Sequence, residues 1–157
     1  MFKTVIWATD GSENADRALP FATKLAEGPD KTLVVVHVRE LIAGRAGGYP
    51  VYADEDELAE KIETQIQEIR KRGIAAKLEL ATATTHGPAY FVAEVAREAG
   101  TDVIVVGTRG HGPVAGALLG SVAQHLLHDA PCPVLVVPPF ETAEAQEPDR
   151  EVARAGA

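Results

Sequence analysis

The stretch that decides the fold begins Val103-Ile104-Val105-Val106-Gly107-Thr108-Arg109-Gly110 and, after nine intervening residues, continues Gly120-Ser121-Val122-Ala123-Gln124-His125-Leu126-Leu127. Its first four apolar residues predict a short buried strand, and the residues after Ser121 are typical of a helix. Glycines between a strand and a helix let backbone N–H groups approach an anion that a side chain would block. The helix N-terminus adds unpaired donors and a partial positive charge. The stretch therefore predicts a strand, a phosphate-binding turn and a helix.

Strand-like and helix-like segments alternate along the whole chain. The pattern predicts strands at residues 4–8, 32–38, 74–81, 102–106 and 133–137, with helices between them. Such alternation predicts an α/β fold with a doubly wound, five-stranded parallel sheet and helices on both faces. Counted along the chain, the expected strand order is 3-2-1-4-5. We expect one domain over residues 1–140 and, because residues 141–157 are rich in Glu, Ala and Pro, a disordered tail there.

The composition and charge of the chain indicate which kinds of partner it can bind and where in the cell it is expected to be. The chain has 157 residues, 46% of them hydrophobic, and a net charge of −8, which argues against nucleic acid or anionic lipid as the main partner. The single cysteine, Cys132, excludes an intrachain disulfide and is expected to be a small core residue. The first apolar run is cut short at Asp10, and no run is long enough to span a bilayer. We therefore expect a cytoplasmic protein that does not contact a membrane.

Two glycine-containing turns are predicted to meet in one cleft. The first strand ends in Thr9-Asp10-Gly11-Ser12, and the fourth ends in Gly107-Thr108-Arg109-Gly110. In the order 3-2-1-4-5 the winding direction reverses between these two strands, which is where doubly wound sheets bind ligands. Two structural alternatives remain open. Asp10 could serve only as a turn-forming Asx residue, and Ser121 could serve only as a helix cap in the box Ser121-Val122-Ala123-Gln124.

Other ligand motifs do not fit the sequence. Gly-Lys-Ser/Thr is absent, so a P-loop is excluded. Gly110-His111-Gly112-Pro113-Val114-Ala115 matches a dinucleotide-binding pattern, but that pattern belongs after the first strand, so we interpret the match as accidental. His125 and His128 have no accompanying ligand set, and we assign no metal site and no catalytic residue.

These ordered motifs resemble the universal stress protein family, specifically its nucleotide (ATP)-binding branch. The matching features are Asp10 after the first strand and Gly107-x-x-Gly110, nine residues, Gly120-Ser121 after the fourth. The resemblance covers residues 2–139. The family usually has Pro where the first strand of this chain ends in Trp7-Ala8.

The resemblance implies a role for each candidate site residue. Asp10, with Thr9 beside it, would contact the adenine–ribose end of the nucleotide, and backbone groups of Val38 would read the adenine edge. The remaining candidates lie around the ribose and phosphates: Gly107 and Gly110 for close backbone approach, Gly120, Ser121 and Val122 as phosphate donors, and Arg109 by position alone.

The predicted function is that of an ATP-binding stress-response regulator with little or slow hydrolysis, at most a weak ATPase. Phosphoryl transfer needs cations against developing charge, and Arg109 is the only Lys or Arg between residues 102 and 139. Mg²⁺ would enter through the phosphates. The alternatives are a binding module for another adenine ligand, such as cyclic AMP, and a nucleotide-free interaction protein.

The last strand, residues 133–137, is predicted to lie at a sheet edge. An exposed apolar edge offers unpaired backbone groups to a partner strand. The resemblance implies a homodimer formed through this strand, antiparallel across a two-fold axis, and the physical interpretation agrees.

Overall fold

The computed structural model describes residues 2–40, 55–83, 86–109 and 119–139. Gly110 and the tail expected at 141–157 lie outside these residues.

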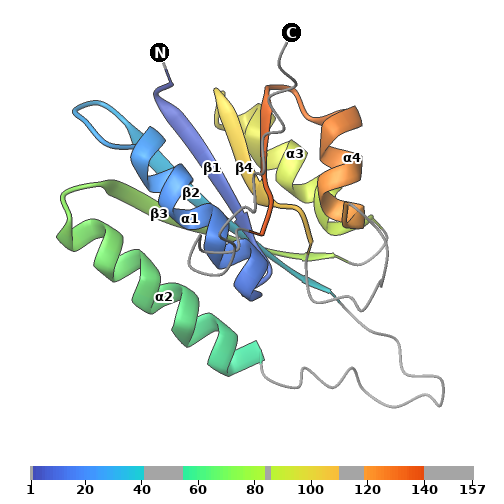
Figure 1. Ribbon diagram of the computed structural model, residues 1–157, viewed down its shortest axis with the longest axis horizontal. Helices are drawn as coiled ribbons and strands as arrows, with labels where there is room; N and C mark the ends of the chain where they lie inside the picture. The colour runs from blue at the N-terminus through green and yellow to red at the C-terminus, as the bar shows by residue number, and fades with distance from the viewer. Residues whose placement is uncertain (1, 41–54, 84–85, 110–118, 140–157) are drawn as a thin grey trace, which may run out of the picture.

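Five strands and four helices alternate along the described chain. In order they are β1 (Thr4–Thr9), α1 (Glu13–Leu25), β2 (Thr32–Glu40), α2 (Glu55–Lys71), β3 (Ala75–Ala83), α3 (Pro88–Glu98), β4 (Val103–Gly107), α4 (Ser121–Asp129) and β5 (Val134–Val137). The strands form one sheet in the order β3-β2-β1-β4-β5, and every pairing is parallel. Figure 1 shows α2 along the β3 edge and α4 near the β5 end. The predicted fold class and strand order are confirmed.

The central strands are apolar because helices cover both of their faces. β4 is buried along its whole length, and β1 is buried after Thr4. β3 instead alternates between more and less exposed positions, in keeping with its place at the edge of the sheet. Four strands extend beyond the predicted ranges: β1 to Thr9, β2 to Glu40, β3 to Ala83 and β4 to Gly107. The extra residues are polar or small, so they carry no apolar signal, yet the parallel ladder continues through them.

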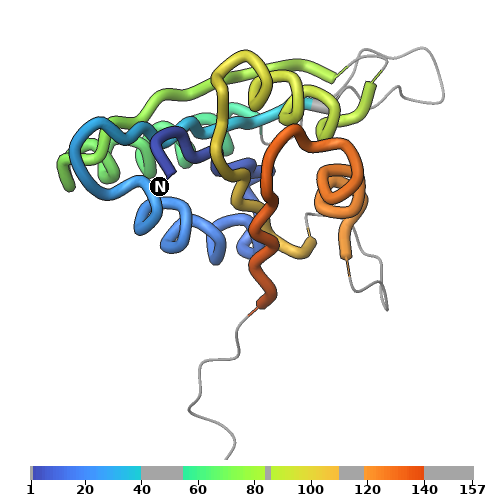
Figure 2. The backbone as a smooth tube through the Cα atoms, turned by 90° about the horizontal axis from the view of Figure 1, so that it is seen from above, coloured from blue at the N-terminus to red at the C-terminus, as the bar shows by residue number. Residues whose placement is uncertain are grey.

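Two helix layers bury the two faces of the sheet. Odd-numbered residues of β1 and β2, such as Trp7 and Val35, pack with α1 and α2. Even-numbered residues, such as Ile6 and Val36, pack with α3 and α4. Figure 2 shows α1 and α3 on opposite sides of the sheet. Trp7 is fully buried, and its Nε1 donates to the Ala15 carbonyl 3.0 Å away, which anchors β1 to the start of α1.

Candidate functional site

The carboxyl ends of β1 and β4 lie side by side at one edge of the sheet. Ala8 pairs with Val106, so Thr9 and Gly107 follow on neighbouring strands. β1 joins one half of the sheet, β2 and β3, to the other half, β4 and β5, and the winding reverses between β1 and β4. The structure therefore brings together the two turns that the sequence pointed to, at the position where doubly wound sheets bind ligands.

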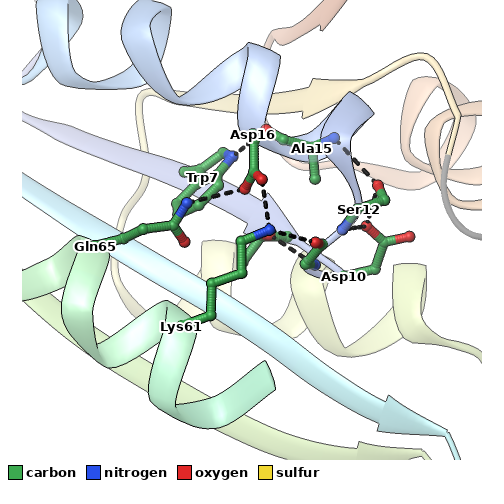
Figure 3. Close-up of polar contacts among 9 residues, drawn as sticks. Trp7, Asp10, Ser12, Ala15, Asp16, Lys61 and Gln65 are labelled. Carbon is green, nitrogen blue, oxygen red and sulfur yellow. Dashed lines mark hydrogen bonds and ion pairs between the residues drawn. The ribbon is translucent and has the colours of Figure 1, made fainter. Parts of the chain in front are cut away.

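The first turn, Thr9 to Ser12, is held by its own side chains; we call it the Asp10 turn. The Gly11 N–H donates to Thr9 Oγ1 at 3.0 Å. Asp10 Oδ1 accepts from the Ser12 N–H at 3.0 Å and from the Ser12 hydroxyl at 2.6 Å. Ser12 Oγ in turn accepts from the Ala15 N–H at 3.2 Å and caps α1 (Figure 3). Asp10 thus forms an Asx turn, whatever further role it has.

The second turn joins the end of β4 to the start of α4. The Thr108 N–H donates to the Val137 carbonyl at 3.0 Å, and the Gly120 N–H donates to the Thr108 carbonyl at 2.6 Å. The Thr108 hydroxyl oxygen is buried and has no hydrogen-bond partner among the residues described. A backbone hydrogen bond thus links the start of α4 to the residue that follows β4, the strand next to the one that leads into the Asp10 turn.

Gly120, and not Ser121, is the N-cap of α4. Its φ of −72° and ψ of 160° are extended, and no side-chain hydrogen bond caps this helix in the described chain. The capping-box alternative for Ser121 is therefore wrong: Ser121 is the first helical residue, and its side chain is exposed. A glycine cap leaves the N–H groups of the first turn without a side-chain acceptor, which suits an anionic ligand.

The other candidates lie around this edge in different settings. Gly107 is buried, Arg109 is exposed and Val122 is intermediate. Val38 belongs to the layer that packs with α3 and α4, and β2 continues two residues past it. Gly110 lies outside the described residues.

Three residues behind the Asp10 turn were missed by sequence reasoning. His37 is buried between the Thr9 carbonyl and Glu55, and Lys61 of α2 reaches the Gly11 carbonyl. The only signal for His37 was a polar residue at an inward position of an apolar strand. Glu55 and Lys61 belong to the charged surface pattern of a helix, so nothing in the sequence distinguished them from solvent-exposed neighbours.

Asp102 and Cys132, away from both turns, have shifted pKa values. Backbone N–H groups of Thr4 and Lys3 lower the pKa of Asp102 at the start of β4, and burial raises the pKa of the Cys132 thiol. Within the described ranges, no cluster of three or more His, Cys, Asp or Glu side chains could hold a metal ion. Nor does any described helix combine the length and apolar character needed to cross a membrane.

Comparison with known proteins identifies the family. Residues 1–138 match the universal stress protein family model. A universal stress protein of Thermus aquaticus is 36% identical over 140 residues, covering 87% of this chain and 99% of the relative.

Two solved structures share the fold. A universal stress protein in complex with cAMP superposes with a TM-score of 0.61 at 24% identity, covering 87% of this chain and 97% of the other. A universal stress protein family protein from Arabidopsis thaliana with AMP bound gives a TM-score of 0.59 at 19% identity, covering 94% and 97%. The chain belongs to the universal stress protein family.

Proposed function

We propose that this protein binds an adenine nucleotide, with ATP the preferred ligand, between the Asp10 turn and the start of α4, and acts in stress-response regulation. The observation that carries the proposal is the glycine cap of α4: N–H donors without a side-chain cap follow the exit of β4, and the carboxylate of Asp10 follows the exit of the neighbouring strand, β1. Donors of this kind favour phosphate, and a carboxylate accepts hydrogen bonds from ribose hydroxyls.

Each candidate has a role in this arrangement. Asp10 and Thr9 lie at the ribose end, and backbone groups of Val38 contact the adenine edge. The phosphate end consists of Gly120, Ser121 and Val122, with Gly107, Arg109 and Gly110 along the chain leading to it. The buried Thr108 hydroxyl is a further donor that the sequence did not single out. Mg²⁺ enters with the phosphates.

Hydrolysis is proposed to be slow or absent. A transferring phosphoryl group needs cationic stabilisation and a group that places the attacking water. Arg109 is the only Lys or Arg between residues 102 and 139, and its side chain is exposed. Backbone N–H groups bind phosphate well but supply little of the charge that a transition state develops.

The second candidate is a site for cyclic AMP, which is favoured by the solved family structure that contains this ligand. A third, a nucleotide-free interaction protein, would leave the same turns unoccupied. We also propose a single domain over residues 1–140, a cytoplasmic location and a homodimer through β5.

Mass analysis of nucleotide released from the purified protein, followed by calorimetric titration, tests the proposal. We expect one ATP per chain with affinity on the order of micromolar, and weaker binding of GTP because backbone groups near Val38 read the adenine edge. Tighter binding of cyclic AMP than of ATP would favour the second candidate. No detectable binding of either adenine ligand would overturn the proposal.

A further inference from the structure

Two side chains bind the backbone on either side of Asp10. One, Lys61, belongs to α2, and the other, His37, contacts Glu55 of α2. His37 Nδ1 lies 2.9 Å from the Thr9 carbonyl oxygen, before Asp10. Lys61 Nζ lies 2.7 Å from the Gly11 carbonyl oxygen, after it. The carbonyls before and after Asp10, the residue proposed to contact the ribose, are therefore both linked by hydrogen bonds to α2, one of them through His37.

Both ring nitrogens of His37 lie within hydrogen-bond distance of an oxygen. A carbonyl oxygen can only accept, so Nδ1 donates to Thr9. The other nitrogen, Nε2, lies 2.8 Å from Glu55 Oε1. Arg39 Nε lies 3.1 Å from the same oxygen, within ion-pair distance although outside hydrogen-bond geometry. His37, with only 4% of its side chain exposed, thus bridges β1 and α2.

Lys61 makes the second contact with the Asp10 turn and also pairs with a carboxylate of α1. Its ammonium lies 2.5 Å from Asp16 Oδ2 in the first turn of α1, while also donating to Gly11 (Figure 3). Gln65, one turn further along α2, donates to the other Asp16 oxygen at 2.9 Å. The Asp10 turn, α1 and α2 are therefore joined through a single polar cluster.

Apolar packing also holds α2 against the Asp10 turn. Gly11 has a φ of +77°, and a Cβ added there would lie 1.8 Å from Leu58 Cδ1. Leu58 of α2 thus packs directly on the turn. Together Glu55, Leu58, Lys61 and Gln65, spaced three or four residues apart, form one face of α2 that contacts the turn or its immediate support.

From these contacts we infer that His37, held by Glu55, and Lys61 are positioning residues that set the place of Asp10 for the nucleotide. The inference rests on the proposed nucleotide site. Neither side chain contacts the ligand in this scheme; each acts through a carbonyl of the Asp10 turn. A shift of α2 would be transmitted to Asp10, so the helix couples its own position to nucleotide affinity.

The test compares His37→Gln and Lys61→Met with Lys77→Met, a control whose lysine pairs only with Glu79 on the β3 edge among the described residues. Calorimetry should show ATP affinity about tenfold weaker in each of the first two variants, as expected for the loss of one charge-assisted hydrogen bond, and unchanged in the control.

A ligand-free measurement separates this inference from the proposed function. In NMR spectra of the protein without nucleotide, the Gly11 and Ser12 amide signals should shift in His37→Gln and in Lys61→Met, and stay in place in Lys77→Met. A wild type that binds ATP while His37→Gln and Lys61→Met bind it equally would overturn the positioning role. If the wild type binds no nucleotide, the proposed function fails, and the role of the two residues in ligand binding fails with it. The amide shifts then show whether the two residues position the turn, and unchanged Gly11 and Ser12 signals in both variants refute this directly.

Discussion

Gly107, at the end of β4, lies against the backbone of Asn14 at the start of α1. A Cβ added to Gly107 would lie 2.6 Å from the Asn14 carbonyl oxygen and 2.9 Å from its carbonyl carbon, closer than real Cβ atoms approach backbone. The packing of α1 on β4 therefore requires a glycine here, independently of any ligand.

Gly107→Ala should for this reason destabilise the fold, by about 1–3 kcal/mol, the usual cost of overpacking a core. Thermal or denaturant unfolding measures it. Gly87→Ser is the matched control: it adds a Cβ into open space at an N-cap with a φ of −70°, and its stability should be unchanged or higher. Equal stability of Gly107→Ala and wild type would mean that α1 can move away from β4. The need for glycine would then come only from the close approach of the nucleotide to the backbone.

Gly120→Asp should separate stability from binding. The φ of −72° is accessible to any residue, and Asp is a preferred N-cap, so α4 should become slightly more stable. The added carboxylate would occupy the N–H groups proposed for phosphate and repel its charge, so ATP binding should fall below detection in calorimetry. Gly120→Asn, which offers a similar cap without the charge, should retain part of the affinity. ATP binding by Gly120→Asp at wild-type strength would move the phosphate site away from α4.

Asp10→Asn tests whether Asp10 does more than form a turn. An amide oxygen can still accept from the Ser12 N–H and hydroxyl, so the melting temperature should stay close to that of the wild type. Loss of the charged acceptor at the ribose should weaken ATP binding by about tenfold. Asp10→Ala should lose both binding and, through the turn, about 1 kcal/mol of stability. If Asp10→Asn binds ATP as tightly as the wild type, the turn-only interpretation is correct.

The proposed dimer depends on backbone groups at the outer edge of β5. The carbonyls of Pro133 and Val137 accept from β4, so by strand alternation Val136 directs its N–H and C=O away from the sheet. Val136→Pro removes that outward donor and should produce a monomer in light scattering at micromolar concentration. Val136→Thr keeps the N–H and should remain a dimer. A dimeric Val136→Pro, or a monomeric wild type, would contradict edge pairing.

Asp102 is expected to make the free energy of unfolding depend on pH in the acidic range. Backbone N–H groups of Thr4 and Lys3, at 2.9 Å and 2.7 Å, hold the pKa of Asp102 below its usual range. The ionised carboxylate therefore stabilises the fold above the unfolded-state pKa, and this contribution is lost as the pH falls through about 4 and below. Asp102→Asn should unfold with a shallower pH dependence in that range. Parallel stability–pH curves for the two proteins would show that the contacts at Asp102 do not favour its ionised form.

The sequence by itself determined the layered fold and the edge at which the two turns meet. Apolar runs in β1, β2 and β4 predicted buried parallel strands, the helical periods between them predicted the crossovers, and right-handed crossovers left few topologies. The cap of α1 is equally local, because the Ser12 hydroxyl accepts from the Ala15 N–H only three residues away. Such features depend on neighbours in the chain.

Only the tertiary structure decided which of several adjacent polar residues have structural roles. Gly120 rather than Ser121 caps α4, because the Gly120 N–H is fastened to Thr108 and this sets where the helix begins. The need for a glycine at position 107 comes from Asn14, more than ninety residues away in sequence. His37 meets the Asp10 turn because β2 pairs with β1 in the register that sets it opposite Thr9, and Lys61 meets it because α2 packs on this side of the sheet. No local periodicity encodes either contact. Long-range packing assigns these roles, and the chain alone shows only residues able to fill them.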